Sequence, residues 1–189
     1  MSVTIIEKKI LSENWYKLYR YTFEVIDKKG KKHTQQREAY DRGNGAVILL
    51  YNQKKGTVIL TRQFRLPTFV NGNQDGMMIE ACAGLLDQDN PEDCIRRETE
   101  EETGYRIHDV KKIYEAYMSP GSVTEILHFF IGEYDEDQKV NEGGGVDEEE
   151  MIDVLEMSFS EALSMVDSGK IKDAKTIMLL QHLRLRRIM

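Results

Sequence analysis

Short apolar runs separated by polar turns dominate the central part of the chain. Two of them, residues 46–51 and 57–64, flank a five-residue loop that contains Gly56, which predicts a β-hairpin. We expect further strands at 77–83, 110–117, 126–134 and 152–159, and helices at about 91–103, 160–168 and 173–187. Because strands and helices follow one another without regular alternation, the pattern predicts an α+β fold, or a mixed sheet flanked by helices.

The N-terminal stretch has a different pattern and predicts a small antiparallel β subdomain over residues 1–42, followed by a larger domain over 43–189. Residues 15–25 are rich in aromatic side chains, and the turn around 28–31 suggests a hairpin. A unit of this size is too small to bury a core alone. We therefore expect it to pack on the rest of the chain or on a second copy.

Composition and charge narrow the possible functions. Of the 189 residues 40% are hydrophobic and 31% charged, which is typical of a folded globular protein. The net charge of −7 argues against non-specific nucleic-acid binding, which needs a basic surface. It does not exclude an anionic substrate, because a bound divalent cation can reverse the local field.

Few features of the sequence indicate the cellular compartment of the protein. Its start lacks a signal-peptide pattern, and its longest apolar run is far shorter than the ~20 residues that span a bilayer. Cys82 and Cys94 belong to no pairing motif, so we expect two buried, reduced thiols. The amphipathic C-terminal segment 179–187 is expected to pack on the core. Together these features predict a cytoplasmic protein without membrane contact.

The segment 91–103 is the best-defined helix in the sequence. Asn90 is a favourable N-cap residue, and Pro91 suits the first helical position. Gly104 stands where a glycine commonly ends a helix. Local signals thus fix both ends of this helix.

Three carboxylates on this helix, Glu98, Glu101 and Glu102, are three or four residues apart and therefore share one face. Like charges at this spacing destabilise a helix by roughly 0.2–0.5 kcal/mol per pair. A divalent cation with oxygen ligands would relieve the repulsion. From these residues alone, a metal site and a solvated acidic face remain equally good interpretations.

A wider pattern resembles the Nudix box, in which a glycine is followed by a loop and then REUxEExGU, where U is aliphatic. Gly84 and the segment 97–105, Arg-Glu-Thr-Glu-Glu-Glu-Thr-Gly-Tyr, match it closely. Asp89 stands in place of a glutamate, one residue closer to the glycine than usual, and Thr99 and Tyr105 replace aliphatic residues. These departures concern loop shape and helix packing more than the metal ligands. The resemblance implies an α/β/α sandwich with a mixed sheet, and hydrolase activity.

The resemblance also implies a role for each matched residue. Glu98 and Glu102 would bind Mg²⁺ or Mn²⁺ together with the backbone carbonyl of Ala83, and Glu101 would be a further ligand or a base. Arg97 would orient the glutamates through charge-assisted hydrogen bonds. Such cations neutralise a diphosphate and lower the pKa of an attacking water.

A second acidic cluster lies at 143–150, where three glycines precede Asp147 and three glutamates. A bare sequence of this kind is usually a solvated loop. In the nucleotide-sugar branch of the Nudix family such a loop supplies a metal ligand and often the general base. The resemblance therefore implies that Glu150 is a ligand and that Glu149, or else Glu148, is the base, with the glycines as a mobile hinge.

The resemblance extends over nearly the whole chain and is closest to this branch. It implies hydrolysis of GDP-mannose to GMP and mannose 1-phosphate; the alternative is ADP-ribose, cleaved to AMP and ribose 5-phosphate. A Nudix-fold protein that binds nucleotides without cleaving them is a further alternative, but such proteins usually lack the box glutamates. The residues that would contact the substrate are Arg65, Ala83, Gly84, Leu85, Glu102, Glu125, Glu149, Glu150 and Lys175.

Some of these residues have simpler interpretations. Arg65 could be a solvated charge at the end of a strand, Lys175 could be a surface residue in a first helical turn, and Glu125 could pair with a neighbouring strand. Within the N-terminal unit, the resemblance implies that Trp15 stacks on the base beside Gln36, Arg37 and Glu38. It also implies a homodimer whose active site is shared between subunits. The alternative for Trp15 is that it only packs the small sheet.

Overall fold

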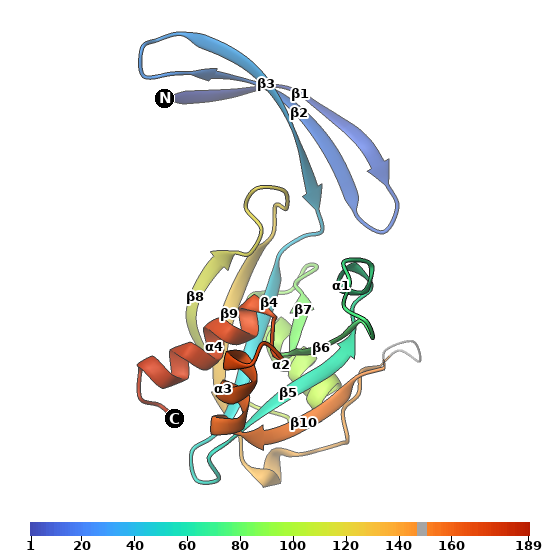
Figure 1. Cartoon of the computed structure of the whole chain (residues 1–189), viewed down its shortest axis with the longest axis vertical. Helices are drawn as coiled ribbons and strands as arrows, with labels where there is room; N and C mark the ends of the chain where they lie inside the picture. Colours follow the sequence, from blue (N-terminus) through green and yellow to red (C-terminus); the bar gives the residue numbers. More distant parts are fainter. Residues whose placement is uncertain (147–150) are drawn as a thin grey trace. The chain divides into compact units, whose positions relative to one another are not determined.

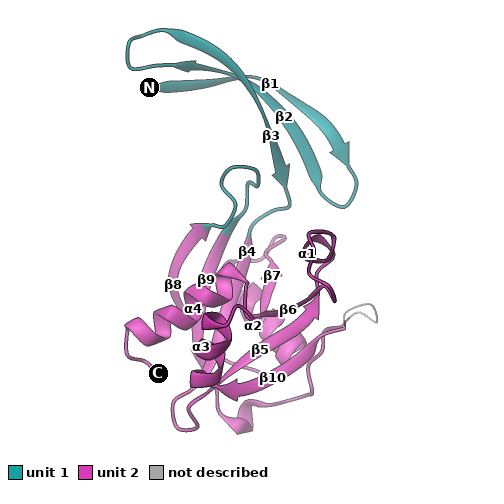
Figure 2. Ribbon diagram, in the orientation of Figure 1, with its two compact units in different colours: residues 1–44, 117–126 teal, residues 45–116, 127–189 magenta. Residues whose placement is uncertain are grey.

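The computed structural model describes residues 1–146 and 151–189, which form two compact units (Figure 2). Unit 1 comprises residues 1–44 and 117–126, and unit 2 comprises residues 45–116 and 127–189. The sequence pattern did not indicate that the 117–126 segment joins the N-terminal residues. It does so because the amide of Tyr40 donates to the Ser122 carbonyl at 2.8 Å and the amide of Thr124 donates to the Tyr40 carbonyl at 3.0 Å.

Unit 1 is built on an antiparallel sheet of three strands, β1 (Ser2–Glu13), β2 (Lys17–Ile26) and β3 (Lys32–Asp41). The predicted turn between β2 and β3 is present: Asp27 Oδ1 accepts hydrogen bonds from the amides of Lys29 and Lys31, and Gly30 adopts a positive φ of 79°. The aromatic stretch forms β2, but Trp15 precedes it in the turn that follows β1.

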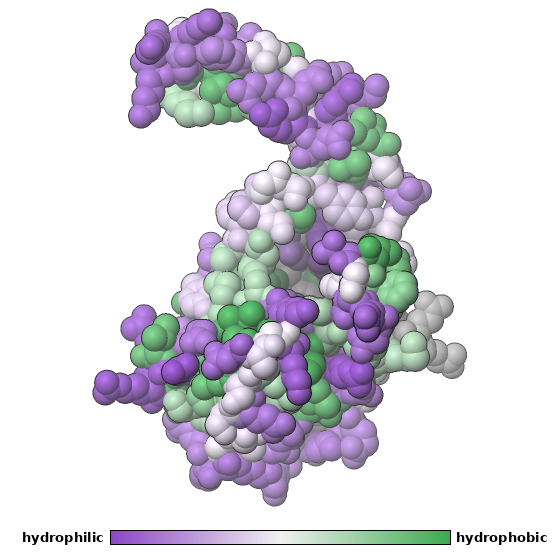
Figure 3. Space-filling view, in the orientation of Figure 1, coloured by the Kyte–Doolittle hydropathy of each residue, from purple (hydrophilic) through white to green (hydrophobic). Residues whose placement is uncertain are grey.

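The small sheet leaves much of its apolar surface uncovered. Tyr19 and Val25 are the buried hydrophobic residues of this unit, as far as the structure describes the chain. Figure 3 shows hydrophobic patches over this sheet among hydrophilic residues. The exposed apolar side chains of β1 are Val3, Ile5, Ile6, Ile10 and Leu11. The unit therefore has almost no core of its own, as its size predicted.

Unit 2 contains a seven-stranded mixed sheet in which β10-β5-β4-β9-β8 are neighbours, while β6 pairs with β5 and β7 with β4. β4 and β9 run parallel, and β5 is antiparallel to both β4 and β10, so the predicted mixed sheet is confirmed. The strands are β4 (Gly45–Asn52), β5 (Thr57–Phe64), β6 (Met77–Glu80), β7 (Ala83–Leu85), β8 (Lys111–Tyr117), β9 (Ile126–Glu133) and β10 (Asp153–Ser158).

The single strand predicted at 77–83 is wrong, because the chain changes partners there. β6 pairs with β5, and after Ala81 and Cys82 the chain continues as β7 beside β4. The amide of Ile48 in β4 donates to the Cys82 carbonyl at 2.9 Å and supports this change of partner. The ends of β6 and β7 are thereby brought close to one another.

Helices cover both faces of the large sheet (Figure 1). α2 (Pro91–Thr103) lies on one face, whereas α3 (Phe159–Asp167) and α4 (Ala174–Leu185) lie on the other. A short α1 (Leu66–Val70) and a 3-10 turn η1 (Glu136–Gln138) were not predicted. The core between the layers includes Ile48, Leu50, Ile95 and Phe130.

Two further predictions concern buried residues. Cys82 and Cys94 are both buried free thiols, as expected. α4 buries Leu179, Leu180 and Leu183, which confirms that the C-terminal segment packs on the core. Within the described ranges, no helix has both the length and the hydrophobicity needed to cross a bilayer.

Candidate active site

Helix α2 has the ends that its sequence predicted. The side chain of Asn90 accepts hydrogen bonds from the amides of Glu92 and Asp93 at 3.1 and 3.0 Å, and Pro91 occupies the first turn. Gly104 ends the helix in the left-handed region, with φ of 79°. These caps fix the register in which the helix presents its glutamates to β7.

Glu98 lies directly over Gly84 in β7. The pairing of Gly84 with Ala46 in β4 fixes the strand beneath the helix. A Cβ atom built on Gly84 would overlap Cγ and Cδ of Glu98, and it would lie 2.5 Å from Oε1. Glycine is therefore required here for a close approach of side chain to backbone, and not for an unusual φ.

Arg97 lies among three carboxylates, while its role in orienting them stays a prediction. Its Nη1 atom is 2.9 Å from Oε1 of Glu98 and 3.1 Å from Oε2 of Glu101, and its Nη2 atom is 3.5 Å from Oδ2 of Asp89. Glu100, in contrast, forms two 2.7 Å hydrogen bonds with Arg106. The acidic face that Arg97 organises thus contains Glu98 and Glu101 but not Glu100.

Glu102 is the most deeply buried of the helix carboxylates, with 7% of its surface exposed. Burial raises the pKa of Glu102 to about 7, and the negative charge of Glu98 also raises it. Hydrogen bonds donated by the Cys82 thiol and the Ala83 amide lower the pKa and so oppose this rise. The Oε2 atom of Glu102 has no hydrogen-bond partner among the described residues. A buried Glu102 oxygen without a partner, beside a second carboxylate, fits a divalent cation that both carboxylates could bind.

This pKa predicts how the stability of the metal-free protein depends on pH. The pKa of Glu102 rises from 4.5 to about 7 on folding, so its protonated form favours the folded state. That contribution is complete below about pH 4.5 and is lost as the pH rises through about 7. The difference of about 2.5 pKa units corresponds to about 3 kcal/mol at 1.36 kcal/mol per unit.

Thermal unfolding in EDTA between pH 5 and 8 measures this effect. We expect the stability of Glu102→Gln relative to the unaltered protein to increase with pH across this range, because the amide does not titrate. Other titrating groups are common to both proteins and cancel in the comparison. If the difference in stability between the two proteins were the same at every pH, Glu102 would not have the raised pKa.

Two cations meet at a buried carboxylate next to this site. Arg65 follows β5, Glu80 ends β6, and Lys175 lies in the first turn of α4. Arg65 Nε and Lys175 Nζ each lie 2.7 Å from a different oxygen of Glu80, whose side chain is 6% exposed. Burial tends to raise the pKa of Glu80, but the charges of Lys175 and Arg65 hold it below its usual value.

This arrangement corrects one simple interpretation and reveals a residue that the sequence pattern missed. Lys175 is not an ordinary surface residue, since its side chain is 14% exposed and also lies 2.8 Å from Oδ1 of Asp173. Arg65 is 40% exposed, so it combines a buried partner with an accessible edge. Glu80 was not predicted as a site residue, although it is the one charged residue in the otherwise apolar segment 77–83.

The predicted base-binding residues all lie in unit 1. Gln36 donates to Thr22 Oγ1 at 3.2 Å, and Arg37 donates to the Gln36 carbonyl at 2.7 Å. Arg37 and Glu38 line a groove of about 730 Å³ within this unit.

Trp15 and Glu125, which were also predicted to contact the substrate, differ in how exposed they are. Trp15 is 86% exposed and touches Tyr16 edge-on, which argues against a role in packing the small sheet. Glu125 lies 3.6 Å from Arg42, and its side chain is 14% exposed. Contact of any of these residues with the substrate stays a prediction.

The glycine run at 143–145 is attached to the end of α2. The amides of Gly144 and Gly145 donate to the carbonyls of Glu102 and Glu101 at 2.9 and 3.1 Å. All three glycines have positive φ. The amides of Gly144 and Gly145 thereby reach helix carbonyls that would otherwise lack partners, whereas the amide of Gly143 donates to Asn141 Oδ1 at 2.7 Å. The glycine run therefore has hydrogen bonds to the helix end in this structure, and the predicted mobile hinge stays a prediction.

The rest of the acidic cluster, including Glu148, Glu149 and Glu150, lies outside the described residues. Within the described part of the chain, no three His, Cys, Asp or Glu side chains converge to form a complete metal site. Besides any ligand from the acidic cluster, a cation at Glu98 and Glu102 would take ligands from backbone oxygens, water or substrate phosphates.

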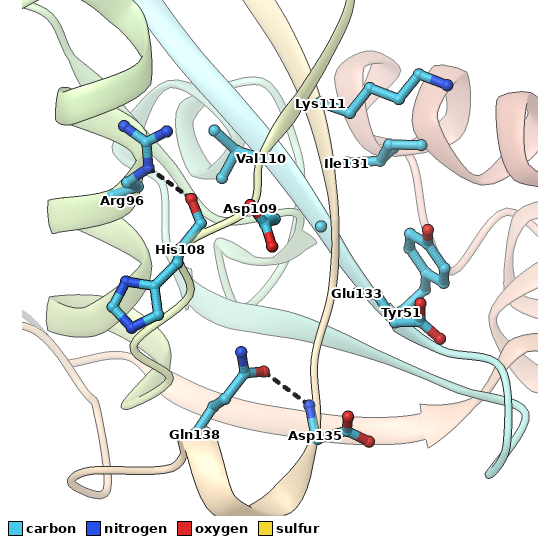
Figure 4. Close-up of a pocket in the computed structure, with 11 residues that line it drawn as sticks. Tyr51, Arg96, His108, Asp109, Val110, Lys111, Ile131, Glu133, Asp135 and Gln138 are labelled. Atoms are coloured by element: carbon cyan, nitrogen blue, oxygen red, sulfur yellow. Dashed lines mark hydrogen bonds between the residues drawn. The ribbon is translucent and has the colours of Figure 1, made fainter.

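A separate pocket of about 480 Å³ lies beside α2 (Figure 4). Arg96 lines this pocket, and it points about 160° away from Glu98 around the helix axis, because two helical residues turn about 200°. Arg96 is already bonded to the His108 carbonyl at 3.0 Å and to Asp93 at 3.1 Å. This pocket lacks the box glutamates and is not part of the candidate site.

Known proteins match this chain over both units. Residues 41–180 match the NUDIX domain family, and residues 2–40 match the GDP-mannose pyrophosphatase NudK N-terminal domain. GDP-mannose pyrophosphatases of Yersinia enterocolitica and Pectobacterium atrosepticum are 61% and 60% identical. The first match covers 96% of both chains, and the second covers 97% of this chain and 95% of the relative.

A solved structure supports the same assignment at the level of the fold. The crystal structure of an ADP compounds hydrolase superposes with a TM-score of 0.73 at 15% identity, covering 97% of this chain and 93% of that one. At that identity the likeness concerns the fold alone. The family match over residues 41–180, which is more than half of the chain, shows that the chain belongs to the Nudix family.

Proposed function

We propose that this Nudix hydrolase cleaves the diphosphate of GDP-mannose to give GMP and mannose 1-phosphate. The observation that carries the proposal is the combination of an acidic face on α2 with two cationic side chains beside it. The charge of Arg65 reaches that face, since it lowers the pKa of Glu102. Negative phosphates and a metal ion therefore have complementary partners in one place. The relatives' substrate, named in their descriptions, supports the choice of sugar nucleotide.

Nudix hydrolases generally use a divalent cation, and we infer Mg²⁺, with Mn²⁺ as a substitute. Glu98, Glu102 and the carbonyl of Ala83 would hold it, joined by Glu150 in our proposal. When bound, it would neutralise the diphosphate and lower the pKa of a water molecule. Arg97 keeps Glu98 and Glu101 in position through its 2.9 and 3.1 Å contacts.

Proton removal from the attacking water needs a carboxylate within hydrogen-bonding reach of it. We propose Glu149 as this base, with Glu148 and Glu101 as alternatives. Glu101 Oε2 already lies 3.1 Å from Nη1 of Arg97, so part of its capacity to accept hydrogen bonds is in use. The family resemblance favours the two glutamates of the acidic loop as the base.

The remaining parts of the substrate would be bound by polar groups and one aromatic ring. Arg65 and Lys175 would bind phosphate oxygens, beside the backbone at Gly84 and Leu85, and Glu125 would accept hydrogen bonds from sugar hydroxyls or guanine N–H groups. We infer that exposed Trp15 stacks on the base, next to Gln36, Arg37 and Glu38.

The exposed apolar residues of β1 support a homodimer in which unit 1 of one subunit contributes to the active site of the other. Such a contact would cover the side chains that the small sheet leaves uncovered. We place the enzyme in the cytoplasm, which suits its two reduced thiols, and infer no nucleic-acid partner from its charge of −7.

Comparison of GDP-mannose with ADP-ribose tests the proposed substrate. We expect kcat/KM with Mg²⁺ to be at least about tenfold higher for GDP-mannose, a difference of about 1.4 kcal/mol in transition-state binding. Chromatography should identify GMP and mannose 1-phosphate as products, and EDTA should abolish turnover. Glu102→Gln prepared in parallel controls for a contaminating hydrolase.

Other outcomes lead to other assignments. Equal or faster turnover of ADP-ribose would overturn the proposal in favour of ADP-ribose hydrolysis. Measurable binding of GDP-mannose without turnover in either Mg²⁺ or Mn²⁺ would instead identify a binding protein.

A further inference from the structure

Glu80 divides its two carboxylate oxygens between two cations that come from different elements. Oε2 accepts from Nε of Arg65, and Oε1 accepts from Nζ of Lys175, both at 2.7 Å. The three residues are separated by 15 and 95 positions in the chain. A single carboxylate thus sets the distance and orientation between an arginine after β5 and a lysine in α4.

Lys175 is fixed from a second direction by the N-terminus of α4. Asp173 Oδ1 accepts from Lys175 at 2.8 Å, while its Oδ2 accepts from the amide and hydroxyl of Thr176 at 2.9 and 2.5 Å. Thr176 Oγ1 in turn accepts from the amide of Ala81, the residue after Glu80, at 2.7 Å. The ion pairs and the hydrogen bonds therefore connect α4 to the end of β6.

Counting donors shows which groups this network leaves for a ligand. Lysine has three N–H donors, and Glu80 and Asp173 use two of those on Lys175. Arginine has five, and Glu80 uses the one on Nε of Arg65. Among the residues that the structure describes, the terminal guanidinium nitrogens of Arg65 have no acceptor within hydrogen-bonding distance. The unused donors of both residues suit the oxygens of a diphosphate.

Stability alone gives little reason for this arrangement. Side chains of Glu80 and Lys175 are only 6% and 14% exposed, and burying such charges costs free energy that their attraction often does not recover. Apolar residues of similar volume commonly serve as well at buried positions. Burying these charges is explained if Arg65 and Lys175 must bind an anion in one fixed geometry.

We propose that Glu80 is a positioning residue that holds Arg65 and Lys175 in the geometry that binds the substrate's diphosphate. The inference rests on the proposed function, in which these two cations contact phosphate oxygens. Glu80 itself does not touch the substrate, because both of its oxygens face the cations. It sets their geometry before binding, so that less ordering is needed when the substrate arrives.

Glu80→Gln tests the proposal, because it keeps the shape of the side chain and removes its charge. We expect kcat/KM for GDP-mannose to fall by about 10–100-fold, by analogy with the loss seen when groups that orient metal ligands are removed. Most of the loss should be an increase in KM, since contacts to phosphate oxygens form both before and during the reaction. An unchanged KM would overturn the proposal.

Two comparisons separate positioning from damage to the fold. Glu156→Gln removes another partly buried carboxylate of the same sheet, which lies 3.3 Å from Lys55, and it should leave KM unchanged. In an Arg65→Ala/Lys175→Ala background, Glu80→Gln should cause no further loss, because nothing remains for it to position. A further loss of the same size in that background would show that Glu80 acts independently of the two cations.

A binding measurement keeps the inference testable if the proposed substrate is wrong. Absence of GDP-mannose turnover by the unaltered protein would contradict the proposed function alone. Calorimetric titration with inorganic pyrophosphate and Mg²⁺ would then decide the role of Glu80. Binding weakened about tenfold or more by Glu80→Gln would support the proposal, whereas equal binding would refute it.

Discussion

Glu102→Gln is expected to lower turnover of GDP-mannose at least about 1,000-fold, equivalent to about 4 kcal/mol of transition-state stabilisation. The carboxylate is buried, and its Oε2 atom has no partner in the described part of the chain, so a bound cation would depend strongly on it. An amide has the same shape but no charge, and it is a weaker ligand for Mg²⁺. The fold should remain intact, because the change removes a buried charge that the metal-free protein must otherwise accommodate.

Steady-state kinetics at saturating Mg²⁺, with circular dichroism to verify the fold, measure this effect. Glu100→Gln is the matched control: it makes the same chemical change two residues earlier in α2, on a carboxylate that bonds Arg106. That variant should keep nearly full activity. Full activity of Glu102→Gln would show that the metal-binding assignment is wrong.

Gly84→Ala is expected to reduce turnover by about 100-fold, the cost that a displacement of about 1 Å can have at an active site. The new methyl group would overlap the side chain of Glu98, which must then move away from its position beside Glu102. The backbone of Gly84 does not have a positive φ, so alanine introduces a clash without backbone strain. Activity should therefore fall more than stability does.

A second alanine substitution provides the opposite case. Gly169 has a positive φ of 73° and open space around it, so Gly169→Ala should lower the melting temperature without changing kcat/KM. Comparing the two variants by thermal unfolding and kinetics separates displacement of Glu98 from general destabilisation. Equal activity of Gly84→Ala and the unaltered protein would mean that Glu98 needs no fixed position over β7.

The sequence predicted helix α2 and its glutamates well because the signals there are local. Asn90, Pro91 and Gly104 each act on the backbone within one turn of their own position, so they mark the helix ends without knowledge of the fold. Thr99 illustrates a departure of little consequence: it is buried where the family has an aliphatic residue, and its hydroxyl donates to the Ile95 carbonyl. The motif match and the structure agree here.

Features that depend on distant contacts were not predictable in the same way. The role of Glu80 depends on Lys175, which is 95 residues away, and no local pattern connects the two. The break between β6 and β7 likewise depends on which neighbouring strand offers free hydrogen-bonding groups. The glycines at 143–145 suggested flexibility, because the sequence does not reveal that the carbonyls at the end of α2 lie beside them.

The contact between those glycines and α2 also determines how this part of the protein opens. The amide hydrogens of Gly144 and Gly145 are held by the carbonyls of Glu102 and Glu101, so they can exchange with solvent only when those hydrogen bonds break. Release of the glycines would leave the last helical carbonyls without partners and promote fraying of that turn. We therefore expect Gly144 and Gly145 to unfold locally together with the helical turn that carries Glu101 and Glu102.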